Sequence, residues 1–442
     1  MPAPIEVDLG RYRAAALRGV APAIEGRLSQ AVGLVLEAQG CAASIGDLFE
    51  LHPGGGSPIQ AEVVGLRGDS TLLMPLGATH GLEVGTPLRR VGRSAYAAVG
   101  EGLLGRVVDG LGRPLDGRPL DDLEAELPLH GAARNPLRRR PVKHPFLVGV
   151  RAIDGLLTMG RGQRIGIFAG GGVGKSSLLG MMVRNAEADV AVIALIGERG
   201  REVEEFVHAT LGDEGLARSV VVAATSADTP LLRVRGALYA TTIAEYFRGR
   251  GLNVLLVMDS VTRYAMAMRE IGLAIGEPPT TKGYTPSVFA SLPLLLERAG
   301  TSAGPGAITG VYTVLVEGDD LSDPIADAAR AILDGHIVLS RDLAERGHFP
   351  AIDLGPSISR VMPKVVPPAA MERAHRAREL LSDAREAHDL MSIGAYKAGA
   401  VPRLDEAAKR EPALIAFLRQ HLDESLDADG VSAALDAVWS DA

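Results

Sequence analysis

The sequence predicts an α/β protein with a central parallel sheet, preceded by a small β-barrel and followed by a helical domain. Three observations predict this arrangement. Short β-rich runs alternate with turn clusters between residues 30 and 91, near-continuous apolar strands alternate with helical stretches from about 148 to 353, and helical sequence follows Met371. A chain of 442 residues is long enough for two to four domains.

The composition excludes several classes of protein. With a formal net charge of −8, the chain is a poor candidate for gripping nucleic acid or an acidic membrane by bulk electrostatics. The single Cys41 allows no internal disulfide and is typical of a reducing compartment. Charges interrupt the N-terminus where a signal peptide would be apolar, and no window holds the roughly 20 apolar residues of a membrane span. We therefore expect a soluble, intracellular protein.

The first elements along the chain are a short helix and the barrel. Residues 1–22 carry arginines among Leu and Ala and are expected to form a solvated helix, with binding of a partner or a membrane surface as the alternative. Between 23 and 97, the runs AVGLVLEA, IQAEVVGL and STLLMPL are separated by turns such as HPGGGSP and predict a small antiparallel barrel. Arg138–Arg140 stand beside prolines, so an exposed connector is favoured over a nucleic-acid patch.

The central part is expected to alternate strand and helix. Buried-type strands are predicted at RIGIFA, VAVIALIG, SVVVAAT, NVLLVMD and GVYTVLVEG, with helices at 175–185 and 230–248 among others. Such a pattern indicates a parallel sheet covered on both faces. Beyond it, ERAHRARELLSDAREAHDL and the segments that follow predict helices as far as Trp439.

The stretch FAGGGVGKSS at residues 168–177 predicts a phosphate-binding loop. It matches G-x-x-x-x-G-K-[ST] except that Ala169 replaces the first glycine, and it has the required context of a strand before it and a helix after it. Backbone N–H groups and the helix N-terminus would hold phosphate oxygens, Lys175 would reach the β/γ-phosphates, and Ser176 would ligate Mg²⁺. A flexible glycine-rich connector, the alternative, does not account for Lys-Ser here. The predicted nucleotide-binding positions are Gly170, Gly171, Gly172, Val173, Gly174, Lys175, Ser176 and Ser177.

Two acidic residues follow other predicted strands. Asp259 ends NVLLVMD, a position from which a carboxylate can hold Mg²⁺ through water. Glu198 follows VAVIALIG and is placed to orient or deprotonate an attacking water, with a surface ion pair to Arg199 or Arg201 as the alternative. Together with the loop, the two carboxylates predict a site for nucleotide hydrolysis.

Several segments, taken together, resemble a known family. AGGGVGKSS, LIGERGREVEEF, VLLVMDSVTRYAMAMREIG, YTVLVEGDDLSDPIADAARAILDGHIVLSRDLAERGHFPAID and SISRVM resemble the type III protein-export ATPases, which are relatives of the catalytic subunits of rotary ATP synthases. TMGRGQRIGIFAG, TKGY and DLMSIGAYKAG are more similar to the flagellar than to the virulence-injectisome branch. The resemblance implies a RecA-like ATPase domain at 98–366 and a C-terminal helical domain at 367–442.

The resemblance also implies further site residues. Arg199 and Arg263 align with arginines around the γ-phosphate, and Phe349 aligns with an aromatic residue that packs on adenine. Arg360, in SISRVM, aligns with the arginine finger that one subunit inserts into its neighbour's site. A homohexamer is therefore expected, in which a monomer would be a poor ATPase.

Partners and location come from the resemblance as well. It implies ATP and Mg²⁺ as cofactors and a position in the cytoplasm, peripheral at the cytoplasmic face of the inner membrane. The implied partners are a stator-type regulator at the N-terminal segment, a coiled-coil stalk protein in the central pore, export chaperones with their substrate proteins, and the export gate, with no nucleic acid. The segment GEPPTTKGY resembles the loop that faces the pore, with a rigid surface turn as the alternative.

Other functions stay open at this point. A non-catalytic nucleotide-binding ring subunit would lack a carboxylate such as Glu198, and a proton-driven synthase subunit would have a longer C-terminal segment. A nucleic-acid translocase would need a basic, aromatic-bearing face, whereas only 4% of this chain is aromatic. The cluster EGDDLSDP lacks the spacing of a calcium loop and is expected to form a polar network near the nucleotide and the ring interface. His144, His208, His336 and His348 are expected to be ordinary core or surface residues.

Overall fold

The computed structural model describes residues 25–54, 56–93, 96–131, 135–316, 318, 320–397 and 399–440. The chain forms two compact units, of which the first ends at Ala95 and the second spans Tyr96–Ala442. The helix predicted for residues 1–22 lies outside the described residues. No helix in the described part of the chain is both long enough and apolar enough to span a bilayer.

The first unit is a closed barrel of six antiparallel strands, in the order β1-β2-β5-β4-β3-β6. Its strands are β1 (Glu25–Val32), β2 (Val35–Gln39), β3 (Asp47–Leu51), β4 (Ile59–Arg67), β5 (Ser70–Pro75) and β6 (Pro87–Arg93). Leu36, Phe49, Val63, Leu73 and Leu88 are among the residues that fill its interior. Because closure pairs every strand on both sides, the barrel has no free edge. The predicted barrel is confirmed.

The second unit is built on a nine-stranded sheet of order β19-β18-β12-β17-β15-β13-β14-β8, with β16 paired to β17. All neighbours are parallel except β18 with β19 and β16 with β17. Its strands are β8 (Arg106–Val108), β12 (Arg164–Ala169), β13 (Val190–Ile196), β14 (Ser219–Ala224), β15 (Asn253–Asp259), β16 (Gly300–Thr301), β17 (Ala307–Leu315), β18 (Gly335–Leu339) and β19 (Ile352–Ser359). Two small sheets pair β7 (Tyr96–Val99) with β9 (Ala125–Pro128), and β10 (Pro145–Phe146) with β11 (Met159–Gly160).

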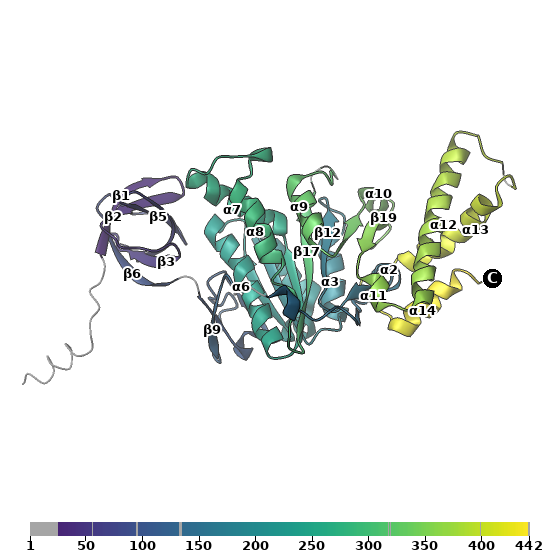
Figure 1. Ribbon diagram of the computed structural model, residues 1–442, viewed down its shortest axis with the longest axis horizontal. Helices are drawn as coiled ribbons and strands as arrows, with labels where there is room; N and C mark the ends of the chain where they lie inside the picture. Colours follow the sequence, from purple (N-terminus) through teal and green to yellow (C-terminus); the bar gives the residue numbers. More distant parts are fainter. Residues whose placement is uncertain are drawn as a thin grey trace, which may run out of the picture. The chain divides into compact units, whose positions relative to one another are not determined.

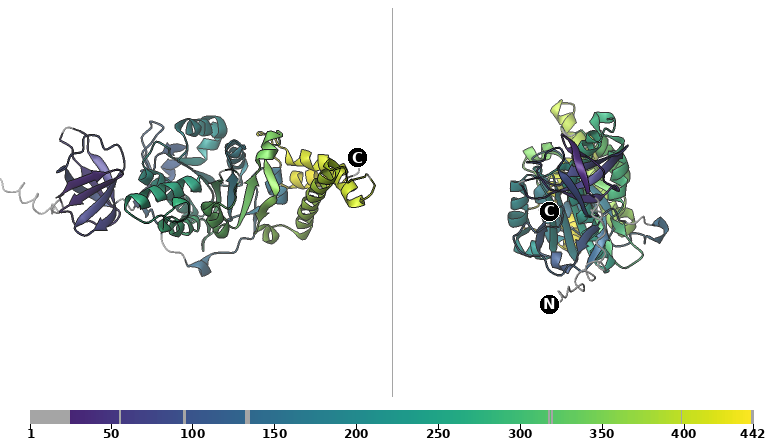
Figure 2. Two further views of the ribbon diagram at one scale, coloured as in Figure 1. Left: turned by 90° about the horizontal axis from the view of Figure 1, so that it is seen from above. Right: turned by 90° about the vertical axis from the view of Figure 1, so that its left-hand side faces the viewer.

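Helices cover both faces of this sheet, as the sequence predicts (Figures 1 and 2). Successive side chains of a strand point to opposite faces. On β15, Leu255 and Val257 therefore join one hydrophobic cluster, and Val254, Leu256 and Met258 join the other. The first cluster is closed by α2, α3 and the C-terminal helices, and the second by α6 to α9.

Side chains cap the N-termini of several helices of the second unit. Thr229 and Ser260 accept hydrogen bonds from the first turns of α6 and α7, and Asp323 and Asp427 do the same for α9 and α14. The α-helices are α2 (Arg151–Leu156), α3 (Lys175–Asn185), α4 (Gly200–Glu205), α5 (Gly212–Ala217), α6 (Pro230–Gly249), α7 (Val261–Ala274), α8 (Pro286–Leu296), α9 (Pro324–Ile332), α10 (Arg341–Glu345), α11 (Met362–Val365), α12 (Pro368–Ser392), α13 (Pro402–Leu418) and α14 (Ala428–Ala437). Single turns form η1 (Glu101–Leu103), η2 (Pro136–Arg138) and η4 (Thr281–Gly283), and the π-helix η3 spans Phe206–Leu211.

The arginine run after β9 ties the chain to the core. Arg139 donates to the carbonyl oxygens of Ala299 (3.2 Å) and Glu297, and Arg140 donates to that of Ser302 (3.2 Å). Arg140 is exposed, as predicted, whereas Arg139 is partly buried, and both hold the connector to the core through these bonds. Their carbonyl partners lie about 160 residues away in the sequence, so no local sequence pattern predicts these contacts.

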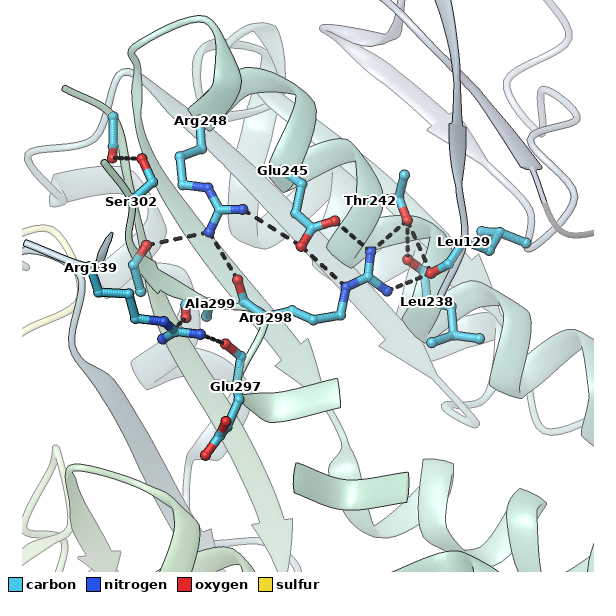
Figure 3. Close-up of polar contacts among 12 residues, drawn as sticks. Leu129, Arg139, Leu238, Thr242, Glu245, Arg248, Glu297, Arg298, Ala299 and Ser302 are labelled. Carbon is cyan, nitrogen blue, oxygen red and sulfur yellow. Dashed lines mark hydrogen bonds and ion pairs between the residues drawn. The ribbon is translucent and has the colours of Figure 1, made fainter. Parts of the chain in front are cut away.

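A buried ionic network lies beside this run (Figure 3). Glu245 lies between the guanidinium groups of Arg248 and Arg298, at 3.6 and 2.7 Å. The two arginines are only 4% and 6% exposed, so two cations that water hardly reaches share a single carboxylate. Arg298 also donates to Thr242 (2.9 Å) and to the carbonyl oxygen of Leu129 (2.5 Å). The network therefore joins α6, the end of α8 and the segment after β9.

We expect the substitution Glu245→Ala to destabilise the second unit by about 3–5 kcal/mol, because it leaves two buried cations without their shared carboxylate. Urea unfolding measures this effect. The matched control is Glu297→Ala, which removes an exposed side chain whose residue contributes only its backbone carbonyl to Figure 3. Equal unfolding midpoints for the two variants would contradict the role of Glu245.

Candidate functional site

The predicted phosphate-binding loop joins β12 to α3. β12 ends at Ala169 and α3 begins at Lys175. Gly172 and Gly174 have φ angles of +78° and +83°, which a residue with a Cβ atom rarely adopts, and this curl directs the loop into the N-terminus of α3. The side chain of Val173 is 1% exposed and packs in the core, so Val173 can offer a ligand only its backbone N–H.

Lys175 lies between the two predicted carboxylates. Its Nζ contacts Oδ1 of Asp259 and lies 3.5 Å from Oε1 of Glu198. The three residues follow or end β12, β15 and β13, whose carboxyl ends share one edge of the sheet. The side chains of Lys175, Glu198 and Asp259 are 13%, 15% and 4% exposed, so a surface ion pair, the alternative for Glu198, is wrong. Arg199 instead pairs with Glu202 at 3.4 Å.

The donor set beside Lys175 fits a magnesium ion. Asp259 supplies a buried carboxylate, held at Oδ1 by the hydroxyl of Thr313 at 2.6 Å. Ser176 supplies a hydroxyl in the first turn of α3 and lines the same cavity as Lys175. Oxygen ligands of these two kinds, completed by water and phosphate, suit Mg²⁺. Thr313 escaped the sequence analysis, although a threonine in the apolar strand GVYTVL was a usable signal.

The environment of Glu198 suits a general base. Burial, together with hydrogen bonding to Glu202, raises its pKa to about 7 against the opposing effect of Lys175. A carboxyl group that titrates near neutral pH can accept a proton from water more readily than an ordinary glutamate. Glu202 was also missed, and its position four residues after Glu198, in the first turn of α4, was the available signal.

A cavity of about 990 Å³ surrounds these groups. Besides Glu198, Glu202 and the loop, Arg199, Arg263 and Lys282 line it, whereas Asp259 is not among the lining residues. Nε of Arg263 is buried without a hydrogen-bond partner, so this guanidinium keeps donor capacity next to the loop. The predicted site residues that line the cavity are Gly170, Gly171, Gly172, Gly174, Lys175, Ser176, Ser177, Glu198, Arg199 and Arg263.

The segment GEPPTTKGY and part of the cluster EGDDLSDP meet at the rim of this cavity. Lys282 pairs with Asp323 at 3.2 Å and lies 3.9 Å from Asp320. Asp323 also caps α9, so the ion pair connects the turn at 281–283 to the start of that helix. Glu317 and Asp319, the other acidic members of EGDDLSDP, lie outside the described residues.

Phe349 lies against the loop from a different segment, between α10 and β19. A Cβ atom at Gly174 would lie 3.3 Å from two ring carbons of Phe349, so glycine at 174 gives the ring room as well as the φ angle. The Phe349 side chain is 44% exposed, which leaves part of the ring free for contact with a base. Its predicted role in adenine packing stays a prediction.

Arg360 does not join the site of its own chain. It follows Ser359, which pairs with Gly335 at the start of β18, so it lies at the edge of the sheet opposite the phosphate-binding loop. Its guanidinium donates to the carbonyl oxygens of Leu333 (3.2 Å) and Arg330 (3.5 Å). Among the described residues, no carboxylate forms an ion pair with Arg360, so its charge is available to another molecule.

We expect turnover of nucleotide to rise at least about fivefold between pH 6 and pH 8, because Glu198 must be ionised to accept a proton and its pKa is near 7. A pH–rate profile measures this. Glu202→Gln removes a group that raises the pKa of Glu198 and should move the inflection to lower pH. Glu198→Gln should lose turnover by about 10²-fold or more at every pH while nucleotide binding remains. A profile with the same inflection in the wild type and in Glu202→Gln would contradict this assignment.

Three family models match successive parts of the chain. The model of the ATP synthase alpha/beta family nucleotide-binding domain matches residues 149–359, and that of the same family's beta-barrel domain matches 28–92. The model of the T3SS EscN ATPase C-terminal domain matches 366–437. The flagellum-specific ATP synthase of Pseudomonas aeruginosa is 56% identical over 91% of this chain and 90% of the relative. The chain belongs to the type III export ATPase family.

Other members of the export ATPase family match to a similar extent. The flagellum-specific ATP synthase of Bacillus subtilis is 53% identical over 90% of this chain and 91% of that protein. The type 3 secretion system ATPase of Xanthomonas euvesicatoria is 49% identical over 94% of both chains. The assembled ATPase EscN of the enteropathogenic E. coli type III secretion system superposes with a TM-score of 0.90 at 46% identity, and covers 94% of this chain and 100% of EscN. The predicted fold and family are confirmed.

Proposed function

We propose that this chain is the Mg²⁺-dependent ATP hydrolase of a type III protein export apparatus. The observation that carries the proposal is the position of Lys175 between Asp259 and Glu198 at one edge of the sheet. Without nucleotide, Lys175 shares its single positive charge between the two carboxylates. When a nucleotide binds, its γ-phosphate can pair with Lys175 in place of the carboxylates. Glu198 is then free to act on water, and Asp259 is free to support the metal.

The residues of the site divide the work of in-line attack on the γ-phosphate. The loop amides and the N-terminus of α3 bind the phosphate chain, and Arg263 and Arg199 face the γ-phosphate. Glu198 orients the attacking water and accepts its proton, and its raised pKa supports this role. Phe349 packs on the adenine. Ser176 and Asp259 would hold Mg²⁺, which would supply charge neutralisation at the phosphates.

The proposed active assembly is a homohexamer in which Arg360 of one subunit completes the site of the next. Two observations support it: Arg360 lies on the edge of its own sheet opposite the loop, and carbonyl oxygens rather than carboxylates hold its guanidinium. The structure of EscN has been determined in its assembled form and in complex with its central stalk EscO. By analogy, the turn at 281–283 would face the pore and contact a coiled-coil stalk protein.

We propose the flagellar export apparatus as the setting. Identity to the flagellum-specific relatives of Pseudomonas aeruginosa and Bacillus subtilis is 56% and 53%, against 49% to the type 3 secretion ATPase of Xanthomonas euvesicatoria. The chain would work in the cytoplasm at the inner face of the membrane. There it would bind a stator-type regulator through residues 1–22, receive chaperones with their substrates, and act on the export gate. The proposal includes the division of the chain into an N-terminal segment, a barrel domain, an ATPase domain and a C-terminal helical domain, with boundaries after residues 22, 97 and 366.

We expect the specific ATPase activity to rise cooperatively with protein concentration, because a site completed by Arg360 exists only where two subunits meet. A steady-state phosphate-release assay across the monomer–hexamer transition, with the oligomeric state followed by mass photometry, measures this. The Arg360→Ala protein serves as the control, since it should assemble without the rise. Constant specific activity through the transition would contradict a shared site.

A further inference from the structure

A second pocket lies on the side of the sheet where Arg360 ends β19. Its volume is about 450 Å³, and it lies between β19, the start of β18 and the helices α11 and α12. We call it the basic pocket, because Arg360, Arg378, His336 and His375 line it. The other lining residues, all described by the structure, are apolar side chains, glycine, prolines and serines, with no carboxylate among them.

Arg378 brings an uncompensated cation to this pocket. It donates from Nη1 to the carbonyl oxygens of Leu354 (2.6 Å) and Ser357 (3.0 Å), and from Nη2 to that of Leu156 (3.4 Å). These three bonds engage at most three of the five N–H groups of a guanidinium. Burial lowers the pKa of Arg378, and no neighbouring acid counteracts that effect. A partly buried cation without a counter-ion favours an anion close by.

Arg360 and His375 add to the positive potential of the basic pocket. Arg360 engages two carbonyl oxygens and, among the described residues, no carboxylate. His375 is exposed and precedes Arg378 by three residues on α12, so both side chains lie on one face of that helix. The pKa of His336 is lowered first by burial and then by the positive charges of Arg330 and Arg360.

We propose that the basic pocket binds a tetrahedral oxyanion of the phosphate class, held by the guanidinium groups of Arg378 and Arg360. Fork-shaped guanidinium groups match the oxygens of such an anion, and two arginines line this pocket with no carboxylate among the lining residues. A phosphate ion suits the pocket better than a nucleotide, because the lining includes no aromatic ring other than histidine on which a base could stack and the volume is less than half of the 990 Å³ around Lys175. The source of the anion in the ring rests on the proposed function. There, ATP hydrolysis would release phosphate next to Arg360.

Inorganic phosphate binding to nucleotide-free Lys175→Ala protein tests the proposal, because this background weakens the phosphate-binding loop as a competing site. Phosphate binding is followed by ³¹P NMR line broadening and by calorimetry. We expect saturable binding that sulfate, but not chloride at equal ionic strength, displaces. The further substitution Arg378→Gln should raise the dissociation constant at least about tenfold. In Arg378→Lys, which keeps the charge but loses the fork, the rise should be smaller.

Two more variants keep the test independent of folding defects. Arg385→Gln, the matched control, removes an exposed cation from the same helix that pairs with Asp353 and does not line the pocket, so it should bind phosphate as its parent does. His375→Glu places a carboxylate at the exposed mouth and should weaken binding about tenfold without disturbing a buried contact. The fluorescence of Trp439, the only tryptophan, reports whether the C-terminal helices remain packed.

Phosphate should also raise the pKa of His336, measured by proton NMR, in the parent but not in Arg378→Gln. Equal phosphate affinity in all variants would overturn the proposal, and so would binding that disappears when the ring assembles, since a second copy would then occupy the pocket. Binding is measured without turnover. If wild-type protein failed to hydrolyse ATP yet bound phosphate here, only the proposed function would fall; the reverse result would remove only the basic pocket.

Discussion

Lys175→Ala protein is expected to release phosphate from ATP at least about 10³-fold more slowly than the wild type. In the structure, Lys175 is the only cation that an ion pair joins to Glu198 and Asp259 among the described residues. Its loss removes the positive charge that would stabilise the β/γ-phosphates, and it also leaves two partly buried carboxylates facing the same space. Both effects oppose the approach of a triphosphate. Single-turnover phosphate release measures the rate, and fluorescent-nucleotide titration separates it from binding.

The control for this prediction is Lys143→Ala, which removes an exposed lysine from the connector before β10 and should leave the rate unchanged within twofold or so. Melting curves of both variants test whether the fold survives. Turnover by a well-folded Lys175→Ala protein within about tenfold of the wild-type rate would contradict the proposed hydrolysis mechanism, because no other described cation forms an ion pair with Glu198 and Asp259.

Arg360→Ala protein is expected to bind nucleotide normally and to lose about 10³–10⁵-fold in turnover. Binding should persist because Arg360 lies at the sheet edge opposite the loop of its own chain. Turnover should fail because the neighbouring site would lose the cation that stabilises the developing charge. Arg385→Ala, which removes an exposed cation from α12, is the matched control and should retain activity.

Mixing the two inactive proteins distinguishes a shared site from a structural role of Arg360. An Arg360→Ala subunit keeps an intact loop, and a Lys175→Ala subunit keeps an intact Arg360. In mixed rings, about a quarter of the interfaces would combine the two intact halves, so turnover should return to roughly that fraction of wild type. A mixture that stays as inactive as its components, although exchange of subunits is demonstrated, would contradict donation in trans.

The sequence was sufficient for most of the α/β core because its signals are local. The strand RIGIFA, the glycines after it and the helix from Lys175 onward lie within about 20 residues, and the structure has β12 and α3 within these bounds. The positions of Glu198 and Asp259 at strand ends were equally local. Their convergence on Lys175 follows from the parallel order of β12, β13, β15 and β17.

Contacts between distant segments were not accessible in this way. The hydroxyl of Thr313 reaches Asp259 from β17, Arg139 donates to carbonyl oxygens at the end of α8, and Glu245 of α6 pairs with Arg298, which follows α8. Each of these contacts depends on which strands become neighbours and how helices cover them. A single sequence encodes that pairing only through the whole fold.

The sequence by itself determined where the predicted phosphate-binding loop and its two strand-end carboxylates stand, since both are defined by spacing along the chain. Only the tertiary structure decided how far apart they lie: Lys175 is in contact with Asp259, whereas Arg360 is at the opposite edge of the sheet. The physical reason is that hydrophobic periodicity specifies elements one at a time. Distances and buried charges, which set pKa values and divide a site between subunits, depend on how those elements pack together.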